Sequence, residues 1–337
     1  MLVSDIPALR NFWYPVAYAA EIDPGPRAVQ LFGERLAVWR DQSGSLTAVL
    51  DECPHRGARL SQGWVVGSCL TCPYHGWRYA PDGRCVEIPA NDPGLPVPSR
   101  ARVSTAPAAE RYGLVWVCIG PAPSSIPTLP ECERDDYAVI HELMEEWHAS
   151  APRIIDNGLD VTHVAFVHRN SVGSDGAPRM ANVDVERDGI SIRFSATYTT
   201  RVNEQQRANT GIQADFTTRS TRGELVQPFV FRGVLEYHET GLRHVLFKTA
   251  TPIDDERTLF CQFVARNDNP DPARVEGIVA LDRTVQDEDK KLLEAIAADF
   301  PLDVHSELHT RADRMTLEYR RALSELASGT TAALSHV

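Results

Sequence analysis

The stretch CPHRGARLSQGWVVGSCLTCPYHGW, residues 53–77, decides how the first part of this chain folds. It holds Cys53 and His55 with one residue between them, and Cys72 and His75 with two residues between them. Glycine, proline and aromatic residues surround both pairs, so each pair is predicted to lie in a tight turn. Two such turns bring thiolate and imidazole donors together, and the stretch therefore predicts a metal site.

The spacing alone leaves the metal open, because thiolates and imidazoles bind zinc as well as iron–sulfur clusters. Zinc signatures usually pair cysteine with cysteine and histidine with histidine, whereas each pair here is mixed. Mixed pairs favour a Rieske [2Fe-2S] centre, in which two Cys bind one iron and two His bind the other. A further CxxC formed by Cys69 and Cys72 leaves a redox pair or a different zinc pair as alternatives.

Around this stretch, residues 11–120 break into short β-like runs separated by turn residues, among them RAVQLFG, RLAVWRD, LTAVLDE and YGLVWVCIG. The following residues 120–136 are rich in proline and have no periodicity, as expected of a connection between domains. These features predict an all-β N-terminal domain over residues 1–120 and a second domain over residues 121–337.

Composition excludes several classes of function. The formal net charge is −12 and no block of Lys and Arg occurs, which argues against nucleic acid or an anionic membrane as the main partner. No window of about 18 uninterrupted apolar residues is present, and MLVSDIPALR lacks the pattern of a signal peptide. The seven cysteines cluster unlike a disulfide framework. We therefore expect a cytoplasmic protein that binds neither nucleic acid nor membrane.

The second half of the chain predicts an α+β domain. Residues 151–168, APRIIDNGLDVTHVAFVH, have apolar residues at helical spacing and are predicted to form a helix. Four alternating segments predict an antiparallel sheet, namely GISIRFSATYTTRV, PFVFRGVLEYHE, LRHVLFKTATPI and RTLFCQFVARND. The polar residues 203–224 are expected to form a mobile loop, a lid or an edge structure. Helical patterns over residues 271–300 and 305–326 complete the domain.

Two histidines within residues 151–168 raise the question of a second metal. His163 and His168 are separated by about 140° around an ideal helix, so both face one metal only if the helix ends or distorts between them. Unrelated core or surface histidines are the alternative. Two His and one carboxylate would form the facial triad of non-haem Fe(II) oxygenases, which leaves positions for O2 and substrate.

These motifs resemble one family over nearly the whole chain. CPHRGARLS and CPYHGWRYAPDGRC are similar to the Rieske motif in nearly every position, and the pattern NxxDxxHxxxxH over residues 157–168 resembles the mononuclear-iron motif of its oxygenases. The family is the Rieske non-haem iron aromatic-ring-hydroxylating oxygenases of the α-subunit-only type. The resemblance implies a bystander role for Cys69 and four cluster ligands, Cys53, His55, Cys72 and His75.

The resemblance also implies a fold and a second ligand set. It implies an N-terminal Rieske domain followed by a helix-grip catalytic domain, and iron ligands His163 and His168. The segment EDKKLLEAI, residues 288–296, resembles the carboxylate segment of the vanillate demethylase and dicamba monooxygenase branch, which makes Asp289 the third ligand. Asp287 and Glu288 are close competitors for that position.

In the family, an Asp at the position of Asp160 bridges the second Rieske His, here His75, to the first iron His, here His163, across a subunit interface. The resemblance therefore implies a homotrimer in which one subunit's cluster supplies electrons to the next subunit's iron. It places Asn157 close to the iron, outside its direct ligands. A carboxylate suits the bridge because it accepts the second N–H of each imidazole.

The implied reaction is monooxygenation, that is hydroxylation or O- or N-demethylation, of a small aromatic or natural-product substrate with O2. The chain has no GxGxxG after a strand and no plant-type C-x4-C-x2-C run, so we expect a separate NAD(P)H-dependent reductase or ferredoxin as electron donor. Ring cis-dihydroxylation is an alternative within the family. A non-catalytic Rieske protein for electron transfer or ligand sensing, and a zinc-stabilised interaction protein, are alternatives outside it.

Overall fold

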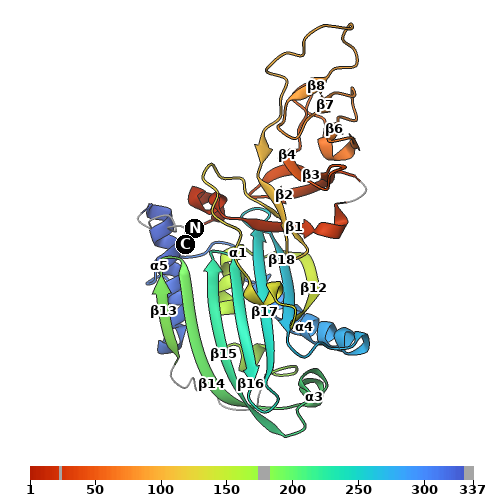
Figure 1. The fold of residues 1–337 in the computed structure, drawn as a ribbon. Coiled ribbons are helices and arrows are strands. Elements are labelled where there is room, and N and C mark those ends of the chain that lie inside the picture. Colours follow the sequence, from red (N-terminus) through yellow and green to blue (C-terminus); the bar gives the residue numbers. More distant parts are fainter. Residues whose placement is uncertain (23–24, 174–182, 330–337) are drawn as a thin grey trace. The chain divides into compact units, whose positions relative to one another are not determined.

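The computed structural model describes residues 1–22, 25–173 and 183–329, and the chain divides into two compact units (Figure 1). One unit is Arg10–Ile126, and the other comprises Met1–Leu9 and Pro127–Val337. The first residues of the chain bond to the second unit, since the Ser4 hydroxyl donates to Asp255 at 2.8 Å and the Phe300 N–H donates to the Met1 carbonyl at 2.9 Å.

Three antiparallel sheets form the unit Arg10–Ile126, with the strand orders β1-β11-β10, β2-β3-β4-β9 and β5-β6-β7-β8. The short β-like runs of the sequence form these strands, and β3 and β11 are buried along most of their length, so both of their faces contact the core. The strands are β1 (Tyr14–Tyr18), β2 (Arg27–Leu31), β3 (Glu34–Arg40), β4 (Leu46–Leu50), β5 (Trp64–Val66), β6 (Cys69–Thr71), β7 (Arg78–Tyr79), β8 (Cys85–Glu87), β9 (Thr105–Ala106), β10 (Ala108–Arg111) and β11 (Leu114–Val117).

The core of this unit includes one cysteine from each Cys–His pair. Trp39 and Leu70 are fully buried, and Cys53 and Cys72 belong to the same cluster of buried side chains. Thiols are among the side chains most often found buried, so their place in an apolar core is ordinary. The two loops that follow these cysteines are thereby anchored in the core at their first residue.

A single antiparallel sheet of seven strands forms the centre of the second unit, in the order β12-β18-β17-β16-β15-β14-β13. Its pairings are mostly regular, with register shifts between His141 and Leu143 in the pairing of β12 with β18 and between Leu225 and Gln227 in the pairing of β15 with β16. The strands are β12 (Ala138–Trp147), β13 (Asp184–Asp188), β14 (Ser191–Arg201), β15 (Phe216–Gln227), β16 (Val230–Tyr237), β17 (Leu242–Pro252) and β18 (Thr258–Arg266).

Helices pack against this sheet at its centre and at both edges (Figure 1). The helices are α1 (Ala151–Leu159), α2 (Val164–Val167), α3 (Glu204–Thr210), α4 (Pro272–Leu293) and α5 (Arg314–Ser328). The long helix α4 packs on the sheet where Ile278 contacts Ile140 and Val264. None of the helices in the described ranges is long and apolar enough to cross a membrane. The predicted class, an all-β unit followed by an antiparallel sheet with C-terminal helices, is confirmed.

Two predicted elements differ from the structure. Residues 151–168 are not one helix, because α1 ends at Leu159 and α2 begins only at Val164. Residues 203–224 are neither a mobile loop nor an edge structure, because they form α3 and most of β15, which pairs with both β14 and β16. Asn203 starts α3 as its N-cap, since its side chain accepts the Gln206 N–H at 2.8 Å.

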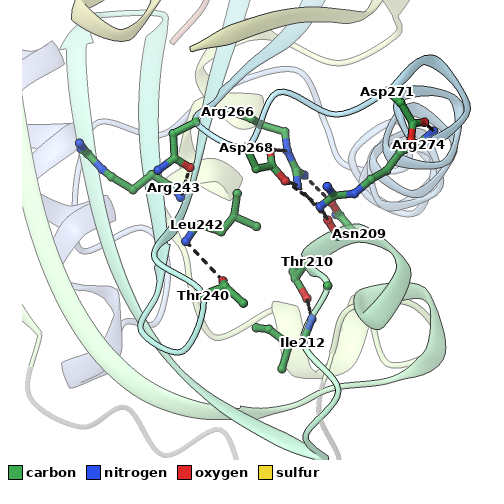
Figure 2. A network of polar contacts seen from close by, with 12 residues as sticks. Asn209, Thr210, Ile212, Thr240, Leu242, Arg243, Arg266, Asp268, Asp271 and Arg274 are labelled. Carbon is green, nitrogen blue, oxygen red and sulfur yellow. Dashed lines mark hydrogen bonds and ion pairs between the residues drawn. The ribbon is translucent and has the colours of Figure 1, made fainter. Parts of the chain in front are cut away.

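The end of α3 is held by a buried arginine of β18, as Figure 2 shows. The Arg266 guanidinium, which is fully buried, donates to the Asn209 side chain and, at 2.8 Å, to the Asn209 carbonyl. Arg274 of α4 donates to the same carbonyl at 2.7 Å, and Asp268 accepts from both arginines. Because the guanidinium groups satisfy carbonyls at a helix C-terminus, the network fixes α3 against β18 and α4.

Candidate functional site

Two loops of the same construction hold the Cys–His pairs of the first unit. The Gly57 N–H donates to the Cys53 carbonyl at 2.8 Å, and the Gly76 N–H donates to the Cys72 carbonyl at 3.0 Å. Both glycines have positive φ, 71° and 70°, a conformation that residues with a Cβ rarely adopt. The sequence CPHRG and CPYHG thus forms two equivalent turns, each closed by glycine.

The four predicted cluster ligands divide into an inner and an outer pair. Cys53 and Cys72 are 2% and 1% exposed, whereas His55 and His75 are exposed. The two imidazole rings lie 4.6 Å apart between centroids. This arrangement suits a cluster with one iron bound by sulfur in the core and one iron bound by nitrogen at the surface.

The geometry of these four residues does not fit one zinc ion. A tetrahedral Cys2His2 zinc, with bonds of about 2.1–2.3 Å, needs all four donor atoms within about 4 Å of one another. Within the described ranges, some groups of three His, Cys, Asp or Glu have ligand atoms that all lie within 4.8 Å of one another. These groups include none of Cys53, His55, Cys72 and His75. Cys69 lies outside the two loops, at the start of β6 opposite Val66.

Tyr79 is a further residue at the first site, and the sequence analysis missed it. Its hydroxyl lies 3.0 Å from the Cys53 sulfur. Burial, together with Cys53, raises the pKa of the phenol, so the hydroxyl stays protonated and can donate to a thiolate. Hydrogen bonds to cluster sulfurs are one determinant of the reduction potential. The only sequence signal was a tyrosine two positions after Trp77.

The second site begins where α1 ends. The chain leaves the helix at Asp160, which has extended backbone angles, and the Thr162 N–H and hydroxyl both donate to Asp160 Oδ1 at 2.7 Å. This turn starts α2, with His163 immediately before the helix and His168 immediately after it. The break allows both imidazoles to face the same point, as the spacing argument required.

The structure brings His163 and His168 together with Asp289 of α4. The Asp289 Oδ1 atom lies 3.2 Å from His168 Nε2 and 3.6 Å from His163 Nε2. Both Asp289 and His168 are 2% exposed. Three donors at these separations surround the position of a single metal ion, and two imidazoles with one carboxylate are the ligand set that mononuclear iron uses.

The electrostatics of the site favour a bound cation. Burial by itself raises the pKa of Asp289, but His168, Lys248 and His163 hold it below the ordinary value, so the carboxylate is charged. The Asp289 Oδ1 atom is buried and has no hydrogen-bond partner among the described residues. A charged, buried oxygen that lies within 3.6 Å of two imidazole nitrogens, without a regular hydrogen bond to either, fits a divalent metal ion.

The two other acidic residues that the sequence offered as the third iron ligand lie elsewhere. Asp287 is exposed on α4. The Glu288 Oε2 atom lies 2.9 Å from His168 Nδ1, on the side of the ring opposite Asp289, and accepts the Ser171 hydroxyl at 2.7 Å. Glu288 thus fixes the orientation and tautomer of the imidazole from behind. The sequence analysis considered Glu288 only as a ligand and did not predict this role.

Asp160 lies beside His163, and Asn157 is joined to Asp160 through the backbone. The Asp160 Oδ2 atom is 3.7 Å from His163 Nδ1, and the Asp160 side chain is 30% exposed. Asn157 lies in the last turn of α1, where its carbonyl accepts the Asp160 N–H. In the part of the chain that is described, no hydrogen bond joins the Asn157 side chain to the triad.

The fold and the two sites define a class: oxygenases that combine a Rieske cluster with a mononuclear non-haem iron. Residues 12–107 match the Rieske [2Fe-2S] domain, and residues 147–329 match the vanillate O-demethylase oxygenase C-terminal domain. The chain belongs to the Rieske non-haem iron oxygenases with this C-terminal domain. It is accordingly an O2-using oxidoreductase that holds a [2Fe-2S] cluster and a mononuclear iron.

Individual relatives support this membership. The chain is 30% identical over 327 residues to methylxanthine N1-demethylase NdmA of Pseudomonas putida, covering 94% of this chain and 89% of the relative. The solved structure of NdmA from Pseudomonas putida CBB5 with caffeine superposes with a TM-score of 0.82 at 29% identity, covering 96% of this chain and 92% of the other. The iron-sulfur subunit of the toluene-4-sulfonate monooxygenase system of Comamonas testosteroni is 29% identical over 85% of this chain and 87% of the relative.

Proposed function

We propose that the chain is the terminal oxygenase of a multicomponent system that hydroxylates an N- or O-bound methyl group of a small aromatic or heteroaromatic molecule. The observation that carries the proposal is the convergence of His163, His168 and Asp289 on one buried point. The substrate class is supported by the likeness to a methylxanthine N1-demethylase over 94% of the chain.

In this proposal, His163, His168 and Asp289 bind the mononuclear iron, which supplies O2 activation when bound. Glu288 orients the His168 ring through Nδ1 at 2.9 Å, and Asp160 holds the outer side of His163. Asn157 lies beside the iron as a positioning residue. His168 and Asp289 are buried, which limits the access of bulk water to the iron and so reduces unproductive side reactions.

The reaction inserts one oxygen atom of O2 into a methyl C–H bond, while the other atom leaves as water with two electrons and two protons. The resulting N- or O-hydroxymethyl group then breaks its bond to the heteroatom. The heteroatom recovers a proton, and the carbon leaves as formaldehyde. A substrate without a methyl group on N or O would instead retain the new hydroxyl.

Electron supply is assigned to the first unit. Cys53, His55, Cys72 and His75 bind the Rieske cluster, and a separate NAD(P)H-dependent reductase or ferredoxin reduces it. Asp160 accepts the N–H of His75 from a neighbouring subunit in a homotrimer, and the partial exposure of its side chain, 30%, is compatible with this contact. The functional division is residues 1–120 for electron transfer and residues 121–337 for oxygenation, in a cytoplasmic protein.

The direct test is turnover with a surrogate reductase. NADH and O2 consumption and formaldehyde release are measured across a panel of N-methyl heterocycles, methoxyarenes and larger natural-product scaffolds. We expect formaldehyde and O2 consumption to match for at least one methylated compound. Asp289→Ala should abolish both, whereas Asp287→Ala, an exposed neighbour on α4, should leave both unchanged.

Two results would overturn the proposal. Diol products without formaldehyde would indicate ring dihydroxylation. Failure of every compound to increase O2 consumption, with a fully reducible cluster, would favour a non-catalytic electron-transfer or sensing protein. A further variant addresses the bridge: Asp160→Asn should retain both metals but sharply slow turnover, and full activity in this variant would refute the contact with His75.

A further inference from the structure

A second group of metal-ligating side chains lies in the catalytic unit, outside the triad. Glu142 of β12, His244 of β17 and Asp282 of α4 each offer a ligand atom, and these atoms lie within 4.8 Å of one another. All three residues are buried, with exposures of 7%, 3% and 8%. The group has no part in the reaction described above.

A β-bulge, the helix α4 and the strand β17 place these three side chains close together. The register of β12 against β18 shifts between His141 and Leu143, so Glu142 is an extra residue of a β-bulge and its side chain turns into the interior. Asp282 lies seven residues before Asp289, which is about 10 Å along α4 and nearly the same face of the helix. His244 projects from the neighbouring part of the sheet, with Nε2 3.5 Å from Asp282 Oδ2.

The polar atoms of the group are unsatisfied. Glu142 Oε1, His244 Nε2 and Asp282 Oδ2 are buried and have no hydrogen-bond partner among the described residues. The same holds for Oε1 of Gln262, whose amide nitrogen donates to Glu142 Oε2 at 2.7 Å. Leaving one buried polar atom unpaired costs about 1–3 kcal/mol, so four such atoms in one place indicate a missing partner.

The charge of the group also calls for a cation. No Lys or Arg in the described ranges makes an ion pair with Glu142 or Asp282, although Lys248 acts on Glu142 from a greater distance. Burial and the neighbouring Asp282 raise the pKa of Glu142, because two carboxylates buried side by side repel each other, and a bound cation would remove that repulsion. Burial lowers the pKa of His244 to about 4, so its imidazole is neutral at pH 7 and keeps a free lone pair. Neutral imidazole is the form that binds metals.

The separations match those of the triad in the same molecule. The His–carboxylate distance is 3.5 Å here, and the two corresponding distances at Asp289 are 3.2 and 3.6 Å. We propose that Glu142, His244 and Asp282 bind a divalent first-row cation, with the Gln262 carbonyl oxygen as a fourth donor. Two carboxylates, an imidazole and an amide oxygen suit Mn2+, Fe2+ or Zn2+.

A cation at this position would join β12 and β17 to α4. The same helix carries Asp289, so the bound ion would fix the helix that supplies the triad's carboxylate. The site is thus a structural metal site that positions the catalytic one, and it does not depend on the proposed substrate or reaction.

Mn2+ is the probe, because its binding is counted by equilibrium dialysis and its ligands are visible by EPR. The full chain with an intact Rieske cluster is used in a His163→Ala/His168→Ala background, which removes both imidazoles of the triad. We expect about one Mn2+ per chain with 14N coupling, which in this background comes from His244. Adding Glu142→Gln/Asp282→Asn, two changes that preserve shape, should abolish the binding.

The matched control is Glu276→Gln/Asp287→Asn, which removes the same charge from exposed positions of α4 and should leave binding unchanged. The visible spectrum of the cluster and far-UV circular dichroism report folding of each variant. Absence of bound Mn2+ in the folded background, or equal binding after Glu142→Gln/Asp282→Asn, would overturn the proposal. A third result would also overturn it: the otherwise wild-type chain binds no such ion, and Glu142→Gln/Asp282→Asn raises its KM for substrate. The group would then line the substrate pocket.

Discussion

Replacement of Glu288 by Gln removes the charge behind the His168 ring while keeping the shape of the side chain. Glu288 Oε2 is 2.9 Å from His168 Nδ1 and also accepts the Ser171 hydroxyl, so it fixes the face of the ring that points to Asp289. Because the Glu288 side chain is only 23% exposed, water screens its interaction with His168 in part. Partners of this kind typically contribute 10–100-fold to metal affinity, or about 1.4–2.7 kcal/mol.

We expect iron at the mononuclear site to bind about 10-fold more weakly in Glu288→Gln and about 100-fold more weakly in Glu288→Ala. The assay is equilibrium competition with a coloured Fe(II) chelator, with the Rieske absorbance as a measure of intact protein. Asp287→Asn, which removes the same charge from the adjacent exposed position, is the control. Equal iron affinity in Glu288→Gln and Asp287→Asn would refute the reasoning.

Three further predictions concern other parts of the molecule. Tyr79→Phe should lower the cluster's reduction potential by about 40 mV, because the lost hydrogen bond to the Cys53 sulfur stabilises the reduced state by about 1 kcal/mol more than the oxidised state. An unchanged potential in voltammetry would contradict this. Glu131→Gln should destabilise the protein by about 2 kcal/mol at pH 7, because Glu131 is buried against Arg232. Burial raises the pKa of Glu131, but Arg232 holds it below its ordinary value of 4.5, so this stabilisation exists above pH 4.5 and is lost in acid. The free energies of urea unfolding of the wild type and Glu131→Gln should therefore converge below pH 4.5, and a constant difference would contradict the prediction. Gly277→Ala should raise the free energy of unfolding by about 0.5–1 kcal/mol, because beyond the adjoining backbone of helix α4 itself nothing lies within 4 Å of the added Cβ; a loss of stability would contradict it.

Strands with regular alternation were predictable from the sequence, and β12 was not. The segment AVIHELMEEW loses its alternation at the bulge, where Glu142 and Leu143 are both buried, so the period of two that marks a strand is interrupted. β15 was missed for a different reason. Its residues FTTRSTRGELVQ are mostly polar and half-buried, and such a sequence resembles a loop.

The candidate site was predictable where its residues are close in sequence. His163 and His168 flank one short helix, and the two Cys–His loops lie within 25 residues, so local spacing carries the signal. Contacts between distant segments leave no such trace. Glu288 and Ser171 meet across 117 positions, and the group of Glu142, His244 and Asp282 joins two strands and a helix.

The central claim is that this chain combines a Rieske cluster with an iron ion at His163, His168 and Asp289. The most direct measurement is the iron content per chain, determined together with the Rieske EPR signal, in the wild type and in Asp289→Ala. We predict about three iron atoms in the wild type and about two in the variant, with the EPR signal unchanged. Equal iron content in the two proteins would contradict the claim.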